Sequence, residues 1–556
     1  MRKNPLAGAL AAAVVGVVGV SNMATALNLS HEGVGQVLIY PFYSANGGND
    51  TLISVVNTTA NSKAVKVRFI EGYNSREVLD FNLYLSEYDV WAAAITDIGA
   101  GVPVLISRIT GPTGDPDPGN SPLIDDIEDT CTVPPTGQSS PFTDLPPLPG
   151  GIGFYVPFRT LFLNDAGGQV PARMFEGYVE MIEMATIEEG GVVDGWVTHD
   201  FSGEPNGGVG CLQLEEAWRV GTPGSGITGA TGFWASSGDF ARGGLTPPSG
   251  GLFGGGAIVN VSDGTYYSYN AEAIDGFNSV VVDHTPPGFE QPSLATSRSV
   301  TGTITSNVFT QQGQLHSSNW GPDPLGDSVD NGRIDAISHV LALDHVYNEW
   351  TTENALNASS EWVVTFPTKR FYVDNAIIGG GQAARRPFTR TFGSSGACEP
   401  VNLTVFDREE NFLQILDFSP SAVGGLALCR EVNVITFNQT GDVSDIFASP
   451  TARNIRTIEQ TIGNPTKVFE RGWMDLDLAG FGNGNPFLPP PVGVEHTSRV
   501  SNDGDVFYGL PVVGFWAVRI ENQAQGESGN NYGGLYRHKG SRRCENDTVG
   551  TCGGTL

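Results

Sequence analysis

The sequence predicts an all-β fold made of antiparallel sandwiches, with long loops and a few short helices. Apolar and polar residues alternate with the period of a β-strand over residues 63–69 and again over 79–85. Turn-forming residues are abundant, because 73 of the 556 residues are Gly and 35 are Pro. We find no internal repeat of about 20 to 50 residues, which argues against a solenoid or a propeller.

The N-terminal part carries the strand pattern most clearly. The runs 37–43 and 52–56 are apolar on both faces and are bounded by turn residues. In the run 63–69 apolar residues alternate with Lys66 and Arg68, so we expect one face to contact the core and the other to contact water. Closely spaced strands of this kind are typical of a sandwich that resembles an immunoglobulin-like module.

Later segments add strands and two short helices to this pattern. A helix is predicted at 212–219, where Leu214 and Trp218 lie four residues apart, and another at 336–343. The sequence further predicts a hairpin of 257–261 with 265–269, a hairpin of 345–350 with 362–366, and strands at 154–162, 178–187, 371–373, 402–406, 432–437 and 512–520.

Composition divides the chain into four segments. Residues 27–300 are predicted to form a β-sandwich domain, in which 110–150 is an acidic loop rich in Pro, Gly and Asp. Residues 301–530 form a second β-rich domain or a continuation of the first. Residues 531–556 form a basic tail that bears a disulfide, and residues 1–26 form a signal peptide.

The N-terminus has the three parts of a secretory signal peptide. Arg2 and Lys3 precede an apolar run over 6–20, and small residues at 24–26 form a cleavage site. No apolar stretch of about 18 residues follows, so we expect no membrane span in the mature chain. The sequence therefore predicts export to the cell surface or to the medium, with a retained N-terminal anchor as the alternative.

Charge and cysteine content point the same way. Asp and Glu number 60 against 30 Lys and Arg, a formal net charge of −30, which argues against nucleic acid and anionic membranes as partners. An even number of cysteines in an exported chain indicates disulfides, and no CxxC spacing indicates a metal site. Many pairings remain open; nearest neighbours favour Cys131 with Cys211, Cys398 with Cys429, and Cys544 with Cys552.

Several strings look like a family of exported proteobacterial proteins for which no activity is established. They are LIYPFY (38–43), LISVVNTT (52–59), KAVKVRFIEGYNSREVLDFNLYLSEYDVW (63–91), DHVYNEW (344–350), EWVVTFPTKRFYV (361–373) and NYGGLYRHKGSRR (531–543). The resemblance runs through most of the mature chain. It implies export from a Gram-negative cell and a single evolutionary unit, and it assigns no catalytic residue.

One loop has the composition of a calcium site. Its oxygen-bearing residues surround Gly332, which favours a sharp turn, but Val329 and Ser338 stand where an EF-hand has its ligands. The acidic segment 115–129 is a second candidate, and a solvated run of charges is the alternative for both. The predicted ligands are Asp323, Asp327, Asp330, Asn331 and Asp335.

A basic cluster near the C-terminus opposes the overall charge. We expect it to dock on an acidic face of the next copy, to bind lipopolysaccharide phosphates, or to fold back on its own acidic body. Its residues are Arg537, His538, Lys539, Arg542 and Arg543.

No motif in the sequence names a reaction. The string closest to a serine hydrolase elbow, at 393–396, has the wrong spacing. Our first hypothesis is therefore an exported, non-catalytic surface or extracellular protein that self-assembles, as in a surface layer or filament, with calcium support. A polysaccharide-binding protein or calcium-dependent adhesin is the second hypothesis, and a secreted hydrolase with carboxylate chemistry is the third.

Overall fold

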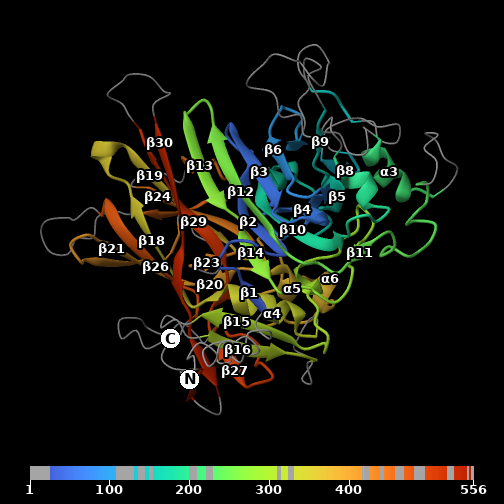
Figure 1. The fold of residues 1–556 in the computed structure, drawn as a ribbon. Coiled ribbons are helices and arrows are strands. Elements are labelled where there is room, and N and C mark those ends of the chain that lie inside the picture. Colours follow the sequence, from blue (N-terminus) through green and yellow to red (C-terminus); the bar gives the residue numbers. More distant parts are fainter. Residues whose placement is uncertain are drawn as a thin grey trace, which may run out of the picture.

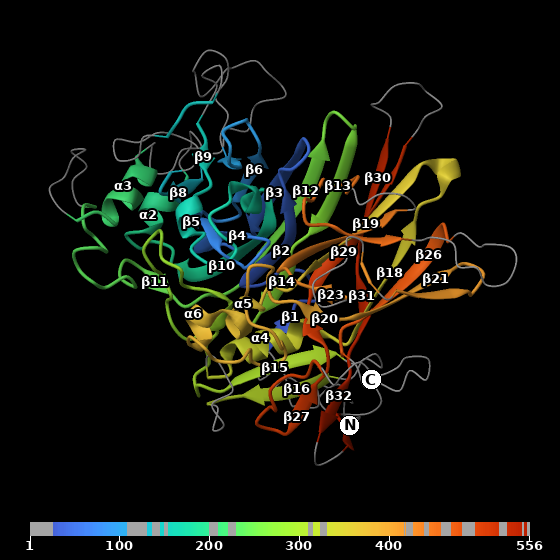
Figure 2. The same cartoon turned by 180° about the vertical axis from the view of Figure 1, so that it is seen from behind.

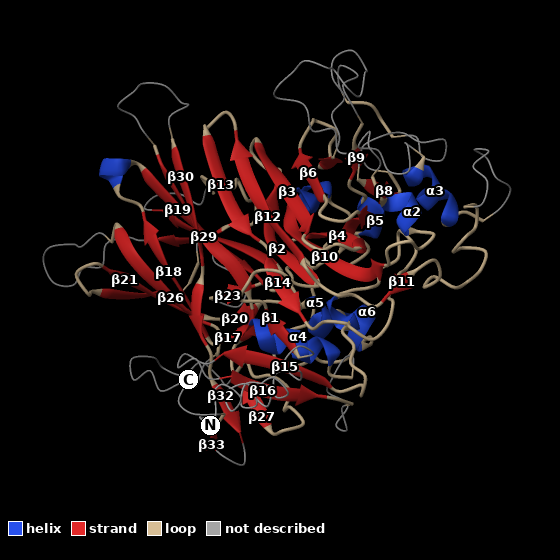
Figure 3. Cartoon of the chain, viewed as in Figure 1, coloured by secondary structure: helices blue, strands red, loops and turns tan. Residues whose placement is uncertain are grey.

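The structure is a computed structural model in which strands dominate (Figure 1, Figure 3). The predicted all-β sandwich architecture is confirmed. Among the described residues, no helix has the length and apolar character needed to cross a membrane. The residues described are 26–107, 130–135, 145–148, 154–199, 209–220, 230–309, 315–322, 331–415, 417–418, 426–438, 444–456, 469–480, 495–521, 531–546 and 550–552.

The largest sheet, called here the large sheet, has ten strands. All of its pairings are antiparallel except that of β1 with β15. Its order is β16 (Leu315–Trp320), β15 (Ile304–Phe309), β1 (Leu27–Leu29), β14 (Glu272–Asp275), β2 (Val37–Ser44), β10 (Glu176–Ile187), β4 (Ser62–Glu71), β5 (Glu77–Leu85) and β8 (Cys131–Val133), and β11 (Leu245–Thr246) pairs with β10.

A six-stranded sheet, the β3 sheet, packs on one face of the large sheet. Phe81 of β5 meets Trp91 of β6 edge to face at 5.6 Å, and the Tyr40 hydroxyl of β2 donates to the Ser54 carbonyl of β3. The two layers resemble an immunoglobulin-like module in architecture, but they contain more than its roughly seven strands. The order is β13 (Thr265–Asn270), β12 (Leu252–Asn260), β3 (Asn49–Asn57), β6 (Val90–Thr96), β7 (Val104–Ile106) and β9 (Val156–Pro157).

Two five-stranded sheets face each other in the C-terminal half, which lies beside the N-terminal strands in Figures 1 and 2. Trp350 and Phe437 stack between them at 5.5 Å. The β18 sheet contains β22 (Phe412–Ile415), β21 (Asn402–Asp407), β26 (Arg471–Asp477), β18 (His345–Thr351) and β31 (Lys539–Ser541). The β19 sheet contains β25 (Arg453–Arg456), β24 (Val432–Asn438), β19 (Ala358–Thr365), β29 (Val513–Ile520) and β30 (Tyr532–Arg537).

Three predicted elements differ from the structure. The hairpin of 345–350 with 362–366 is wrong, because β18 and β19 follow each other in sequence but belong to opposite sheets. Residues 371–373 lie in helix α5 rather than in a strand. The strand predicted at 154–162 is reduced to β9 and a 3₁₀ turn.

The helices are short and lie at the margins of the sheets (Figure 3). Those predicted at 212–219 and 336–343 are confirmed with shifted bounds, as α3 and α4. The helical segments are α2 (Asp194–Val197), α3 (Gly210–Ala217), α4 (Arg333–Leu341), α5 (Arg370–Val373), α6 (Asn375–Ile378), η1 (Thr160–Phe162), η2 (Pro171–Phe175), η4 (Leu294–Thr296) and η5 (Asn354–Leu356). Smaller pairings join β17 (Ala342–Leu343) to β28 (Leu510–Pro511), β20 (Glu399–Pro400) to β23 (Ala427–Leu428), and β27 (Asp505–Phe507) to β32 (Cys544–Asn546) and β33 (Gly550–Thr551).

One hydrophobic core runs through both halves of the chain. Phe42 of β2 packs on Phe447 at 5.0 Å and on Phe515 at 6.3 Å, and the Thr365 hydroxyl donates to the Pro41 carbonyl at 2.7 Å. Buried residues of both halves therefore belong to one hydrophobic cluster. Disulfides join Cys131 to Cys211, Cys398 to Cys429 and Cys544 to Cys552, which confirms the nearest-neighbour pairing.

Candidate functional site

Charged residues cover one face of the large sheet where β10, β4 and β5 run side by side. Arg68 of β4 lies in register between Glu180 of β10 and Asp80 of β5. Its guanidinium donates to Glu180 and to Glu77, each at 2.6 Å. Because Arg68 is only 2% exposed and Lys66 is 0% exposed, the prediction that this face contacts water is wrong.

The segment before η4 covers this charged face. The Lys66 ammonium lies 3.3 Å from Asp80 and donates to the Pro286 carbonyl at 3.0 Å. The Gly288 amide donates to the same Asp80 carboxylate at 2.8 Å. Burial raises the pKa of Glu180 and lowers that of Lys66, while the opposite charges nearby act against both shifts. These charges are tolerated inside the protein because each of them has a partner.

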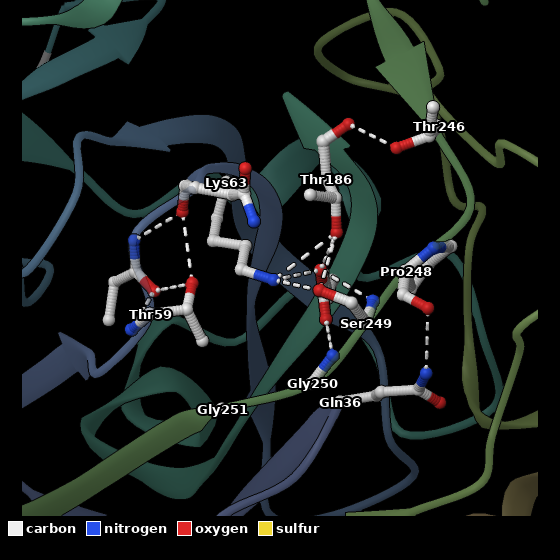
Figure 4. Close-up of polar contacts among 12 residues, drawn as sticks. Gln36, Thr59, Lys63, Thr186, Thr246, Pro248, Ser249, Gly250 and Gly251 are labelled. Carbon is white, nitrogen blue, oxygen red and sulfur yellow. Dashed lines mark hydrogen bonds and ion pairs between the residues drawn. The ribbon is translucent and has the colours of Figure 1, made fainter. Parts of the chain in front are cut away.

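A second buried charge, Lys63, is the centre of the polar cluster in Figure 4. Its ammonium donates to Glu183 at 2.9 Å, to the Thr186 hydroxyl at 3.2 Å and to the Ser249 hydroxyl at 2.6 Å. Glu183 also accepts the backbone amides of Ser249 and Gly250, at 3.0 and 2.7 Å. The cluster thereby fastens the turn that precedes β12 to strands β4 and β10.

An exposed serine beside a buried lysine raises the question of Ser–Lys nucleophilic chemistry. A lysine that takes the proton of a serine hydroxyl has to be neutral and to offer a lone pair. The Lys63 ammonium instead donates to three oxygens, and the Glu183 carboxylate stabilises its positive charge. The geometry therefore assigns this cluster a structural role.

A cavity of about 570 Å³ lies beside the buried charged face. Three guanidinium groups in its wall have carboxylate partners: Arg68 pairs with Glu77 and Glu180, Arg298 lies 3.3 Å from Asp283, and Arg370 lies 3.2 Å from Glu290. Because these arginines are paired with carboxylates, the wall attracts an anionic ligand less strongly than unpaired arginines would. The arginines of the wall are Arg68, Arg298, Arg333 and Arg370.

The predicted calcium loop lies partly outside the described residues. That part contains Asp323, Asp327 and Asp330, and the acidic segment 115–129 also lies outside them. Asp335, in the first turn of α4, is 4% exposed; its carboxylate accepts from Arg499 at 3.0 Å and from the Tyr372 hydroxyl at 2.9 Å. Asn331 is exposed and has a positive φ of 48°. Asp335 would have to exchange these partners to bind calcium, and the site stays a prediction.

The segment predicted as a basic tail lies largely in strands. Its described residues form β30, β31, β32 and β33, which extend three different sheets. Arg537 pairs with Glu272 of β14, and Arg543 pairs with Glu545, each at 2.5 Å. These contacts support the alternative in which the segment folds back on its own acidic body.

The remaining members of the predicted cluster differ in charge and exposure. His538 is neutral, because its Nε2 donates to the Val363 carbonyl at 3.0 Å and burial lowers its pKa to about 3. Lys539 is exposed. Arg542 reaches inward and donates to the Val340 carbonyl at 2.8 Å. The five residues therefore do not form one cationic patch.

One group of ligand-type side chains lies close enough to hold a metal among the described residues. It contains His316, Asp505, Cys544 and Cys552. The two cysteines are joined in a disulfide, so their sulfurs are not thiolates that could bind a metal. Asp505 accepts from His316 at 3.1 Å and from the Ser318 hydroxyl at 2.7 Å. The group is a hydrogen-bond network beside a disulfide.

The outward face of the β3 sheet is uncharged over most of its area, and we call it the neutral face. The register places Leu52 between Ala94 and Ala257, and Ser54 between Ala92 and Gly255. Small residues leave a shallow hollow of about 590 Å³ at its centre. Its residues are Leu52, Ser54, Val56, Val90, Ala92, Ala94, Phe253, Gly255, Ala257, Val259, Tyr266, Ser268 and Asn270, with Asp50 at one end.

The outward face of the β18 sheet carries aromatic rings instead, which we call the aromatic row. Trp473 of β26 stacks on Phe406 of β21 with ring centroids 4.1 Å apart, and Phe412 of β22 follows in register. Trp473 is 40% exposed and Phe412 is 51% exposed. Glu349 is the cross-strand neighbour of Trp473, so a polar group flanks the rings.

Comparison with known proteins gives no match to a family model, a curated protein or a solved structure. The resemblance to exported proteobacterial proteins therefore stays a prediction. The functional proposal rests on the two outward faces, because the buried charges around Arg68 and Lys63 are paired with carboxylates within the chain.

Proposed function

We propose that this chain is an exported, non-catalytic protein of the cell surface or the extracellular space that assembles with copies of itself through the neutral face. The three disulfides support an oxidising compartment. The observation that carries the proposal is a broad exposed face without charge in a chain of net charge −30. Exposed apolar patches of this kind mark interaction sites.

The negative net charge of the chain indicates which kind of partner binds the neutral face. Two copies repel each other wherever their acidic surfaces meet, and buried carboxylates would add a desolvation cost. Contact through the neutral face avoids both penalties. A cationic partner would gain more from the acidic surface elsewhere, so a second copy suits the neutral face better.

Light scattering on the purified mature protein tests the proposal. We expect the wild type to associate with rising concentration, and more strongly with NaCl, because salt screens the repulsion between acidic copies. Leu52→Glu and Val90→Glu place a carboxylate on the neutral face and weaken association by about tenfold or more. Val300→Glu adds the same charge at an exposed valine of another surface and serves as the control. A wild type that stays monomeric under all conditions excludes the proposal.

Calcium support is tested in the same experiment. If the loop 323–335 holds calcium that promotes assembly, calcium strengthens association more than NaCl of equal ionic strength, and EDTA reverses the gain. Asp327→Asn should remove the calcium effect and leave the salt effect intact. Equal responses to calcium and NaCl would remove calcium from the proposal.

A polysaccharide-binding or adhesive protein is the second candidate, and the aromatic row favours it. Sugar rings pack on flat exposed aromatic faces, and neighbouring polar groups take the hydroxyls. Trp473→Ala is expected to reduce glycan-array binding by about tenfold or more, whereas Phe253→Ala on the neutral face leaves it unchanged. Loss of binding in EDTA would identify a calcium-dependent adhesin. Cleavage of a bound glycan would instead support the predicted carboxylate hydrolase.

A further inference from the structure

A cavity of about 260 Å³ lies where the N-terminal strands meet the C-terminal sheets. Strands β1, β14, β18, β29, β30 and β31 and the end of α4 all contribute to its wall (Figure 1). Most of the wall is aliphatic. The aliphatic residues are Leu29, Leu341, Leu343, Val346, Val512 and Val513.

The charged residues of the wall are Glu272, Arg537, Lys539 and Arg542. Arg537 and Glu272 pair with each other at 2.5 Å, and Arg537 remains 64% exposed. This ion pair also borders a neighbouring cavity of about 460 Å³. His538, which also lines the wall, is neutral, since both of its ring nitrogens are hydrogen-bonded to groups of the chain.

Arg542 is the unusual member of this wall. It donates one hydrogen bond to the Val340 carbonyl, but its buried Nε has no partner, and it forms no ion pair within the described residues. The nearest carboxylates are committed elsewhere: Glu272 to Arg537, and Asp344 to the Ser541 hydroxyl at 2.6 Å. A buried donor on a charged group is costly when no acceptor meets it.

We propose that this cavity binds a short aliphatic carboxylate, with its head group at Arg542 and its chain along the aliphatic wall. Arg542 is partly exposed and lines the cavity, and a carboxylate matches the donor geometry of its guanidinium. The alkyl chain covers apolar surface that is otherwise in contact with water. The size of the cavity suits one short chain rather than a whole phospholipid.

Isothermal titration calorimetry of the full mature chain tests the site, with sodium octanoate as the probe. Octanoate is expected to bind at one site per chain, and affinity should rise about fourfold per methylene from butanoate to octanoate. Octyl glucoside, which lacks the charge, should bind about tenfold more weakly, and acetate, which lacks the chain, should show no measurable binding. Binding to phosphatidylglycerol vesicles without binding to octanoate would contradict the proposal and point to a membrane surface.

Two variants and a control locate the binding. Arg542→Gln removes the head-group donor and is expected to weaken octanoate binding by about tenfold or more. Leu343→Asn, at a partly exposed position of the wall, should weaken it by about fivefold. Arg543→Gln removes the same charge one residue away, where the side chain pairs with Glu545, and should leave binding unchanged.

Either of two results overturns the proposal: no octanoate binding by the folded wild type, or equal affinity in the wild type, Arg542→Gln and Leu343→Asn. The melting temperature of each variant shows whether it is folded. The site is independent of the neutral face, so light scattering and calorimetry can fail separately.

Discussion

Two sheet faces of this protein reverse the usual distribution of charge. On the large sheet, the face that carries Lys66, Arg68 and Glu180 is buried. On the β3 sheet, the face that carries Leu52 and Val90 is exposed, at 44% and 50%. Alternation along a strand therefore shows that its two faces differ, but it does not show which of them contacts solvent.

Pairing explains the buried face. Each charge there has a neighbour of opposite sign across the strand or in the covering segment, which offsets the cost of desolvation. No such pairing is needed on the neutral face, where small uncharged side chains leave a smooth surface. The predictions below test this contrast, starting with the variant that has the largest expected effect.

Removal of Arg68 is expected to have the largest effect on stability. Arg68→Met leaves Glu77 and Glu180 buried without a cation and should lower the free energy of unfolding by about 3 to 5 kcal/mol, measured by urea denaturation. The double variant Arg68→Met/Glu180→Gln should recover part of the loss. A cost below about 1 kcal/mol would show that the buried face does not depend on pairing.

Glu361 of β19 is a buried carboxylate without a cation beside it, which sharpens the comparison. It accepts hydrogen bonds from the Ile446 and Phe447 amides and the Ser444 hydroxyl, yet burial raises its pKa from 4.5 to about 7. A folded-state pKa above the unfolded one favours folding at low pH, and this contribution is lost as pH rises to about 7. Stability should fall by up to about 3 kcal/mol between pH 4.5 and 7.

Glu361→Gln is the matched variant for this pH dependence. Glutamine cannot ionise, so the variant lacks this pH dependence. The free energy of unfolding of the wild type, minus that of the variant, should therefore fall between pH 4.5 and 7 and stay constant above pH 7. Urea denaturation at several pH values measures this difference. A difference that does not change with pH would show that burial leaves the pKa of Glu361 at its unfolded value.

Ser249→Ala should have an intermediate effect. It removes one of the acceptors of the Lys63 ammonium and should cost about 1 to 2 kcal/mol, since the other two acceptors remain. Thermal unfolding measures the cost. The structural role of the Lys63 cluster would be contradicted if the wild type hydrolysed an ester substrate and Ser249→Ala lost this activity without losing stability.

Leu52→Glu should have the smallest effect on folding. The new carboxylate points to solvent, so the free energy of unfolding of the monomer should change by less than about 0.5 kcal/mol. Low protein concentration separates this quantity from association. A loss as large as that of Arg68→Met would mean that the neutral face is part of the core of the single chain.

Local patterns predicted much of the fold. The strands between residues 37 and 96, the hairpin of β12 with β13 and the three disulfides follow from alternation, turn residues and spacing. The local pattern does not predict which strands pair with β18 and β19, because the partner strands β26 and β29 lie far away in the sequence. A short connection normally makes a hairpin, but here it crosses between two facing sheets.

The candidate surfaces were harder to predict. The aromatic row joins Phe406, Phe412 and Trp473 from three strands, and no local pattern links them. The basic residues near the C-terminus were visible as a cluster, yet Arg537 and Arg543 pair with carboxylates while the Arg542 side chain reaches inward to the Val340 carbonyl. The Nε of Arg542 lacks a hydrogen-bond partner because Glu272 and Asp344 bind other groups. Those contacts form only in the folded chain, so the sequence does not predict them.

The position of β1 has a consequence for the time course of folding. This strand begins one residue after the predicted signal peptide ends, and it lies between β14 and β15. Its place in the large sheet therefore cannot be completed until residue 309 of 556 has emerged. Closure of so long a loop is slow. If the chain is exported in the unfolded state, as proposed, residues 27–29 stay unpaired in the large sheet until β14 and β15 have also crossed the membrane.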